Sequence, residues 1–127
     1  MAKGKILIID DEKLVRTMLT DLLQIKGFTV VSAEDGPTGL AAAKKEKPNV
    51  IILDVMMPGM DGFEVCETLK KDGATTTIPV IILTASEDAH LTKKAFKAGA
   101  EFTLVKAGKT EGLLSTLHLA LSLARPS

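Results

Sequence analysis

The sequence predicts an α/β protein built on one doubly wound, five-stranded parallel sheet with five helices. Five short apolar runs rich in β-branched residues alternate along the chain with stretches of helical length. The runs are mostly continuous, which is typical of strands buried on both faces of a parallel sheet. Repeated alternation of strand and helix then favours crossovers that cover both faces of the sheet. No linker or low-complexity tract interrupts the pattern, so residues 1–127 are predicted to form one domain.

The strands are expected at the apolar runs, which are ILII (6–9), FTVV (28–31), VIIL (50–53), VIIL (80–83) and FTLV (102–105). The first helix is expected over 12–27, where Gly27 supplies a stop signal. Its buried face is predicted to carry Val15, Met18, Leu19 and Leu22. Helical periodicity therefore assigns this helix one apolar side, packed on the sheet.

The later helices are expected over 36–47, 63–71, 86–99 and 109–124. Pro37 stands in the first turn of one of them, where a helix tolerates proline. Asp61 and Glu64 have the spacing of a capping box. The last helix has an apolar stripe of Leu113, Leu117, Ala120 and Leu121. Each helix is thus predicted from its own start, stop or apolar face.

The composition excludes several classes of protein. Sixteen basic residues balance 16 acidic ones, which argues against a domain that binds nucleic acid or a membrane surface directly. The single cysteine, Cys66, excludes an internal disulfide and a cysteine-based metal site. The apolar runs are too short to span a bilayer, and the N-terminus has no signal-peptide layout. A cytoplasmic location is therefore expected.

Polar residues directly follow the five apolar runs: Asp10, Ser32, Asp54, Thr84 and Lys106. In a doubly wound sheet these positions lie along the carboxyl edge, where ligands bind at the topological switch point. With strand order 2-1-3-4-5, that point falls between strands one and three, so Asp10 and Asp11 are predicted to face Asp54. Clustered carboxylates raise one another's pKa unless a cation joins them.

An open site with oxygen ligands favours Mg²⁺, which suits phosphate chemistry. Lys106 and Thr84 could then bind phosphoryl oxygens, and Asp54 could form an aspartyl phosphate. Taken singly, each residue has a simpler interpretation, because an Asp after a strand is often a cap and a lone Lys is often solvated. Their shared position on one edge favours a functional site.

Four segments together resemble the receiver domains of two-component response regulators: ILIIDDE, VIILDVMMPGMDGFEV, VIILTAS and AGAEFTLVK. The resemblance implies a flavodoxin-like fold and phosphoryl transfer from the phosphohistidine of a sensor kinase or from a phosphotransfer protein. It implies that Asp54 is the acceptor, and that Asp10, Asp11, Asp54 and the backbone carbonyl of Met56 bind Mg²⁺. Thr84 would be the switch hydroxyl and Lys106 the lysine that pairs with the phosphoryl group. A downstream effector or a fused output domain would receive the signal.

Two positions depart from the family pattern. Thr103 occupies the place where the family usually has an aromatic residue, and Phe102 is one position early. Strand alternation places neighbouring side chains on opposite faces, so Phe102 is not expected to substitute. Ala107 stands where the family usually has proline, and we expect a trans Lys106–Ala107 bond with the turn rearranged around Gly108. Met56 and Ser86 hold the flanking positions that tune the lifetime of the phosphoryl group in the family.

Other functions remain as alternatives at this point. A receiver-like interaction module that is never phosphorylated would fit Thr103 and Ala107, although the acidic residues argue against it. A phosphatase with an aspartyl nucleophile would usually carry Asp-x-Asp after its first strand, where this chain has DDE. A flavodoxin-type electron carrier would need a Ser/Thr-rich phosphate loop after that strand. The favoured interpretation is a signalling module that catalyses only its own phosphorylation and slow dephosphorylation.

Overall fold

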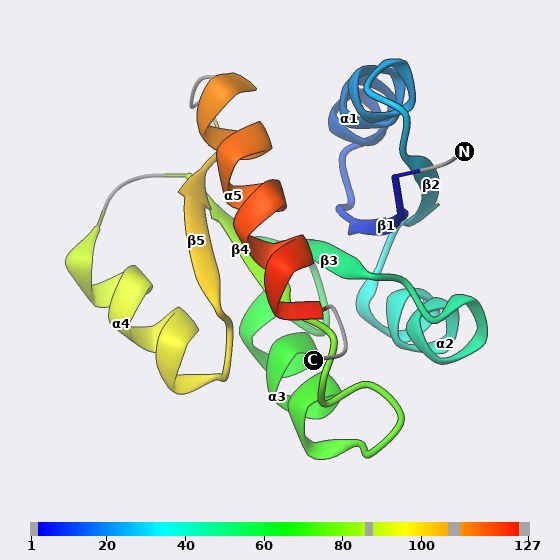
Figure 1. Ribbon diagram of the computed structural model, residues 1–127. Coiled ribbons are helices and arrows are strands. Elements are labelled where there is room, and N and C mark those ends of the chain that lie inside the picture. Colours follow the sequence, from blue (N-terminus) through cyan, green and yellow to red (C-terminus); the bar gives the residue numbers. More distant parts are fainter. Residues whose placement is uncertain (1–2, 86–87, 107–109, 125–127) are drawn as a thin grey trace.

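The structure is a computed structural model that describes residues 3–85, 88–106 and 110–124 (Figure 1). Its strands are β1 (Lys5–Ile9), β2 (Thr29–Ala33), β3 (Val50–Asp54), β4 (Val80–Thr84) and β5 (Phe102–Val105). Its helices are α1 (Lys13–Ile25), α2 (Gly36–Glu46), α3 (Gly62–Lys71), α4 (Ala89–Lys97) and α5 (Thr110–Ala124). The elements alternate along the chain as the apolar runs predict.

The strands form one parallel sheet in the order β2-β1-β3-β4-β5. The predicted fold class and strand order are therefore confirmed. The chain reverses its direction of winding between β1 and β3, so the carboxyl ends of these two strands border the switch point. Residues that follow β1 and end β3 consequently meet at one edge of the sheet.

Helices cover both faces of the sheet, α1 and α5 on one side and α2, α3 and α4 on the other (Figure 1). The side chains of each strand alternate between two separate cores. Ile6, Ile8 and Ile52 pack with helix residues such as Leu117, whereas Leu7, Ile9 and Leu53 belong to the core under α2, α3 and α4. The central strands are buried on both faces, which explains their continuous apolar sequences.

Two details of the elements differ from the sequence prediction. Met18, which the periodicity predicts on the buried face of α1, is 61% exposed, and Leu23, outside the predicted set, is fully buried. Helix α1 is apolar on more than one side, so periodicity alone does not select the face that meets the sheet. Ser32 was predicted to follow its strand but lies within β2, opposite Ile8. β2 is an edge strand, so its side chains are less completely covered than those of the central strands and can be polar.

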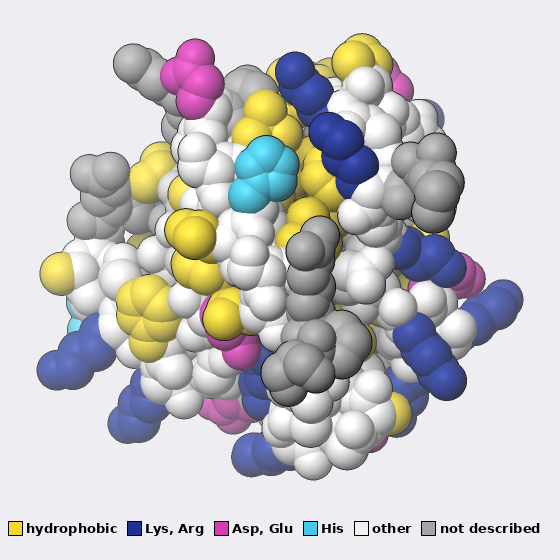
Figure 2. Space-filling view, viewed as in Figure 1, with side chains coloured by type: hydrophobic (Ala, Val, Ile, Leu, Met, Phe, Trp, Pro, Cys, Tyr) yellow, Lys and Arg dark blue, Asp and Glu magenta, His cyan; other side chains and the backbone are white. Residues whose placement is uncertain are grey.

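Several hydrophobic side chains reach the surface, and Figure 2 shows some of them between charged groups on one face. The large exposed ones are Leu14, Met18 and Ile25 on α1, Met56, Phe96 on α4, and Leu119 and Leu123 on α5. Among the described residues, no helix is both long enough and apolar enough to cross a membrane. The side chains of His90 and His118 are also exposed.

Candidate functional site

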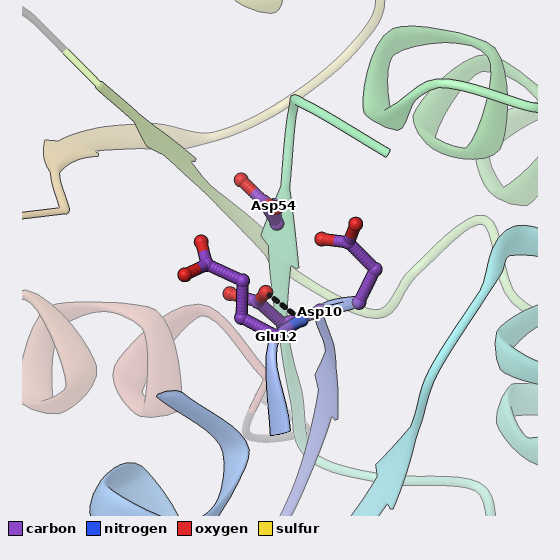
Figure 3. A group of neighbouring side chains, drawn as sticks. Asp10, Glu12 and Asp54 are labelled. Atoms are coloured by element: carbon purple, nitrogen blue, oxygen red, sulfur yellow. Dashed lines mark hydrogen bonds between the residues drawn. The ribbon is translucent and has the colours of Figure 1, made fainter. Parts of the chain in front are cut away.

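The carboxyl ends of β1 and β3 bring two buried carboxylates together. Asp10 directly follows β1, and Asp54 is the last residue of β3. Ile9 and Leu53, which precede them, are partners in the register of these strands. Asp10 is 0% exposed and Asp54 is 2% exposed, so both charges are almost fully removed from water. Figure 3 shows both residues, with Glu12, gathered at this edge of the sheet.

Each buried aspartate has one oxygen held by a backbone N–H and one oxygen without a hydrogen bond. The Glu12 N–H donates to Asp10 Oδ1 at 2.9 Å, and the Met56 N–H donates to Asp54 Oδ1 at 3.3 Å. The Oδ2 atoms of both aspartates are buried, and no donor in the described part of the chain hydrogen-bonds to either. Buried carboxylate oxygens are costly unless a cation or a donor satisfies them. The two aspartates therefore need a positively charged partner.

Lys106 supplies one positive charge from the end of β5. The backbone N–H of Lys106 donates to the Thr84 carbonyl at 2.6 Å, and this bond fixes the Lys106 backbone beside β4. Its Nζ atom lies 3.2 Å from Asp10 Oδ2 and 3.3 Å from Asp54 Oδ2, within ion-pairing range but without hydrogen-bond geometry. The same Nζ donates to Asp10 Oδ1 at 3.3 Å and to Glu12 Oε1 at 2.5 Å. The Lys106 side chain therefore reaches both buried aspartates.

The electrostatics of the site follow from this crowding. Burial, and then the neighbouring charge of Asp10, raise the pKa of Asp54 from 3.8 to about 6, although Lys106 opposes the shift. The mutual repulsion expected from the sequence is therefore present, but burial is the larger cause. Burial by itself would lower the pKa of Lys106, but its hydrogen bonds to Glu12 and Asp10, together with the negative charges of Asp54 and Asp10, raise that pKa above the usual value. Lys106 is accordingly a permanent positive charge in this site.

The other predicted site residues lie around this centre. Asp11 is exposed, and it belongs to a cluster with Asp10, Glu12 and Asp54 in which one carboxylate oxygen from each residue lies within 4.8 Å of the others. Thr84 ends β4, is 3% exposed, and its hydroxyl donates to the Leu104 carbonyl at 3.5 Å. The Met56 side chain is 70% exposed beside Asp54. Ser86, Ala107 and Gly108 lie outside the described residues, as does the Lys106–Ala107 bond.

Three residues that the sequence analysis did not single out help to build the site. Glu12 accepts the shortest of the Lys106 hydrogen bonds described here. In the sequence, the only sign of this role is that Glu12 is the third acid of DDE. Arg16, one turn into α1, donates from Nη1 to the Asp10 carbonyl at 2.7 Å. A Cβ atom on Gly62 would overlap the Asp54 carbonyl oxygen and lie 2.7 Å from Val55 Cα. Glycine at 62 therefore lets α3 start directly against the end of β3.

The two faces of β5 separate Thr103 from its aromatic neighbour. Phe102 and Leu104 pack in the core under α1 and α5, and Phe102 is the register partner of Ile81 in that core. Thr103 pairs with Ile82, whose side chain belongs to the opposite core. The prediction that strand alternation places Phe102 and Thr103 on opposite faces of the sheet is therefore confirmed.

A family model described as "response regulator receiver domain" matches residues 6–118. The match begins at the second residue of β1, contains the other four strands and reaches into α5, so it includes every described residue of the site. The chain therefore belongs to the receiver domains of two-component response regulators. Receiver domains are signalling modules.

Particular relatives have different lengths. The chain is 38% identical to Protein PilH of Pseudomonas aeruginosa over 119 residues, which is 94% of this chain and 98% of PilH. It is 42% identical over 106 residues to the probable transcriptional regulator ycf27 of Porphyridium aerugineum, which is 84% of this chain and 43% of ycf27. The chain thus spans nearly all of PilH but under half of ycf27.

A solved structure has the same architecture. Chemotaxis protein CheY4 of Vibrio cholerae matches with a TM-score of 0.88 and 35% identity, covering 94% of this chain and 99% of that chain. The flavodoxin-like fold implied by the sequence motifs is therefore confirmed.

Proposed function

We propose that this receiver domain accepts a phosphoryl group on Asp54, in a reaction that requires Mg²⁺. The donor would be the phosphohistidine of a sensor kinase or of a phosphotransfer protein. The observation that carries the proposal is the pairing of a permanent lysine charge with two buried aspartates whose Oδ2 atoms lack hydrogen bonds. This arrangement supplies a carboxylate nucleophile, buried carboxylate oxygens that can bind a cation, and a positively charged side chain that can bind the incoming phosphoryl group.

The described residues fit a divalent cation. Two buried oxygens without donors lie in a cluster of four carboxylates, and all-oxygen sites of this kind suit Mg²⁺. Asp10, Asp11 and Asp54 would hold the ion, together with the backbone carbonyl of Met56. When bound, Mg²⁺ neutralises charge on the transferring phosphoryl oxygens.

The chain's own residues would carry out the transfer. At neutral pH Asp54 is mainly ionised, because its pKa of about 6 lies below 7. One Asp54 oxygen attacks phosphorus and forms the new O–P bond, while the P–N bond of phosphohistidine breaks and its electron pair stays on the imidazole. Lys106 then binds a phosphoryl oxygen, and the Thr84 hydroxyl turns to donate to another. The Asp54 carboxylate gives up its own negative charge when the mixed anhydride (acyl phosphate) forms, and it then carries the dianionic phosphoryl group.

The wider role follows from this chemistry. We infer that residues 1–127 form one receiver domain that catalyses only its own phosphorylation and slow dephosphorylation. Its partners would be the donor kinase or phosphotransfer protein and a downstream effector or fused output domain. Balanced charge supports a domain that does not itself bind nucleic acid or membranes. We also infer a cytoplasmic location, where sensor kinases present their phosphohistidine.

Acetyl phosphate provides a direct test. Incubation with acetyl phosphate and Mg²⁺ should add one phosphoryl group to the intact mass, and peptide mapping should assign it to Asp54. The Asp54→Asn variant should gain none, and excess EDTA should abolish uptake by the parent chain. Stoichiometric uptake by Asp54→Asn, or full uptake in EDTA, would contradict the mechanism. No uptake by the parent from acetyl phosphate or from a phosphorylated kinase would instead indicate an interaction module that is not phosphorylated.

A further inference from the structure

Glu12 occupies a helix-capping position without capping the helix. It is the N-cap residue of α1, with an extended backbone, and its side chain makes no capping hydrogen bond. In the other helices with capped starts, an Asp fills this position and its carboxylate accepts a backbone N–H, as Asp35, Asp61 and Asp88 do. Glu is a weaker capping residue than Asp, Asn or Ser. The Glu12 carboxylate is therefore available for another contact.

That contact is with Lys106, 94 residues away in the sequence. Glu12 Oε1 lies 2.5 Å from Lys106 Nζ, closer than either aspartate, whose oxygens lie 3.2–3.3 Å from the same atom. The Lys106 side chain is only 19% exposed, whereas the Glu12 side chain is 59% exposed. Glu12 thus approaches the ammonium group from the solvent side, and the aspartates approach it from the buried side.

The arrangement creates a competition for the aspartate oxygens. Lys106 Nζ lies within 3.3 Å of Asp10 Oδ2 and Asp54 Oδ2, the two atoms that lack hydrogen bonds. A divalent ion held by these oxygens would repel the ammonium group from them. Lysine has a long, flexible stem, so without another partner it would move toward solvent. Three carboxylates contact the Lys106 ammonium group, those of Asp10, Asp54 and Glu12. Of these, only Glu12 is not a proposed metal ligand.

We propose that Glu12 is a positioning residue that holds Lys106 beside Asp54 when a metal ion and a phosphoryl group occupy the site. The inference rests on the proposed function, because it concerns the same acceptor site. An ammonium group has three donors, so Lys106 can keep one hydrogen bond to Glu12 and direct the others to phosphoryl oxygens. Glu12 then acts through Lys106, although its own negative charge would by itself repel the phosphoryl group.

Positioning of Lys106 by Glu12 would strengthen phosphoryl binding, whereas the negative charge of Glu12 would weaken it. The opposite signs of these two effects make the role of Glu12 testable. Beryllofluoride, an analogue of the phosphoryl group, can be titrated at saturating Mg²⁺ and its bound signal measured by fluorine NMR. If Glu12 positions Lys106, Glu12→Gln weakens beryllofluoride binding about three- to fivefold, the size expected for one partly exposed ion pair. In a Lys106→Met background the same Glu12→Gln change should leave binding unchanged or make it tighter, because only the repulsion is removed.

The alternatives give other results. Tighter binding by Glu12→Gln in the chain with Lys106 would show that only charge repulsion acts. Equal weakening in both backgrounds would place the effect in the start of α1, and no change at all would also overturn the proposal. Lys106→Gln serves as a second background if Lys106→Met does not fold. Glu34→Gln is the matched control, since Glu34 is an exposed acid following β2 at the same sheet edge and lies outside the carboxylate cluster.

Failure of this inference and failure of the proposed function remain distinct. If the parent chain binds no beryllofluoride and takes up no phosphoryl group, the proposed function is wrong. If the parent binds beryllofluoride but Glu12 and Lys106 show no coupling, the acceptor site stands and only the role of Glu12 is withdrawn.

Discussion

Replacing Asp54 by Asn should stabilise the metal-free protein at alkaline pH. Asp54 is 2% exposed, and its Oδ2 lacks a hydrogen bond even though Lys106 Nζ lies 3.3 Å away. Its pKa is raised from 3.8 to about 6, first by burial and then by Asp10. A shift of about two pKa units corresponds to about 3 kcal/mol by which the ionised carboxylate destabilises the fold. Asn keeps the shape of the side chain and removes the charge.

The pH dependence identifies the cause. Because the pKa is higher in the folded state, the penalty is complete above about pH 6 and disappears as the pH falls toward 3.8. We expect Asp54→Asn to be more stable than the parent by about 2–3 kcal/mol at pH 8, allowing for the cost of a buried amide. Near pH 4 the electrostatic penalty is only about 0.5 kcal/mol, because the folded parent is then protonated at Asp54, so after the same allowance for the amide the two proteins should differ by no more than about 0.5 kcal/mol.

Urea unfolding in EDTA at both pH values measures these differences. Far-ultraviolet circular dichroism is the suitable signal, because the chain has no Trp or Tyr. Added Mg²⁺ should narrow the difference at pH 8, since an ion that binds the folded parent stabilises it. Asp21→Asn, at an exposed position on α1, should change little at either pH. A variant less stable than the parent at pH 8, or stabilised equally at both pH values, would refute the electrostatic reasoning.

Three further outcomes follow from the packing around the site. Gly62→Ala should lower the unfolding free energy by about 1–3 kcal/mol, because the added Cβ atom would overlap backbone atoms. Gly73→Ala is the control and should not lower it, since no atom lies within 4 Å of a Cβ atom at that position. Equal urea midpoints for the two variants would argue against the predicted overlap. Met56→Asn should shorten the lifetime of the phosphorylated protein, because the apolar Met56 side chain excludes the attacking water rather than orienting it; an unchanged rate of phosphate release would count against that role. Cys66 is buried, and burial raises the pKa of its thiol to about 12. A thiol reagent should therefore modify Cys66 only after urea has unfolded the protein. Prompt labelling of the native protein would disprove this prediction.

The sequence by itself determined the fold class and the main members of the site. Continuous apolar runs require strands buried on both faces, and their alternation with helices leaves few topologies. The position of Asp10, Asp54, Thr84 and Lys106 at strand ends then follows from the sheet, because parallel strands end at a common edge. These predictions needed no knowledge of side-chain packing, which is why they agree with the structure.

Only the tertiary structure decided which neighbours those residues have. The contact between Glu12 and Lys106 joins residues 94 positions apart, and no local pattern specifies it. The requirement for glycine at 62 arises because α3 starts against the backbone of β3, a distance set by packing. Likewise, α1 has apolar residues on more than one side, so the sheet selects Leu23 for burial and leaves Met18 exposed. Local sequence specifies elements, whereas the burial of each side chain depends on how the elements pack together.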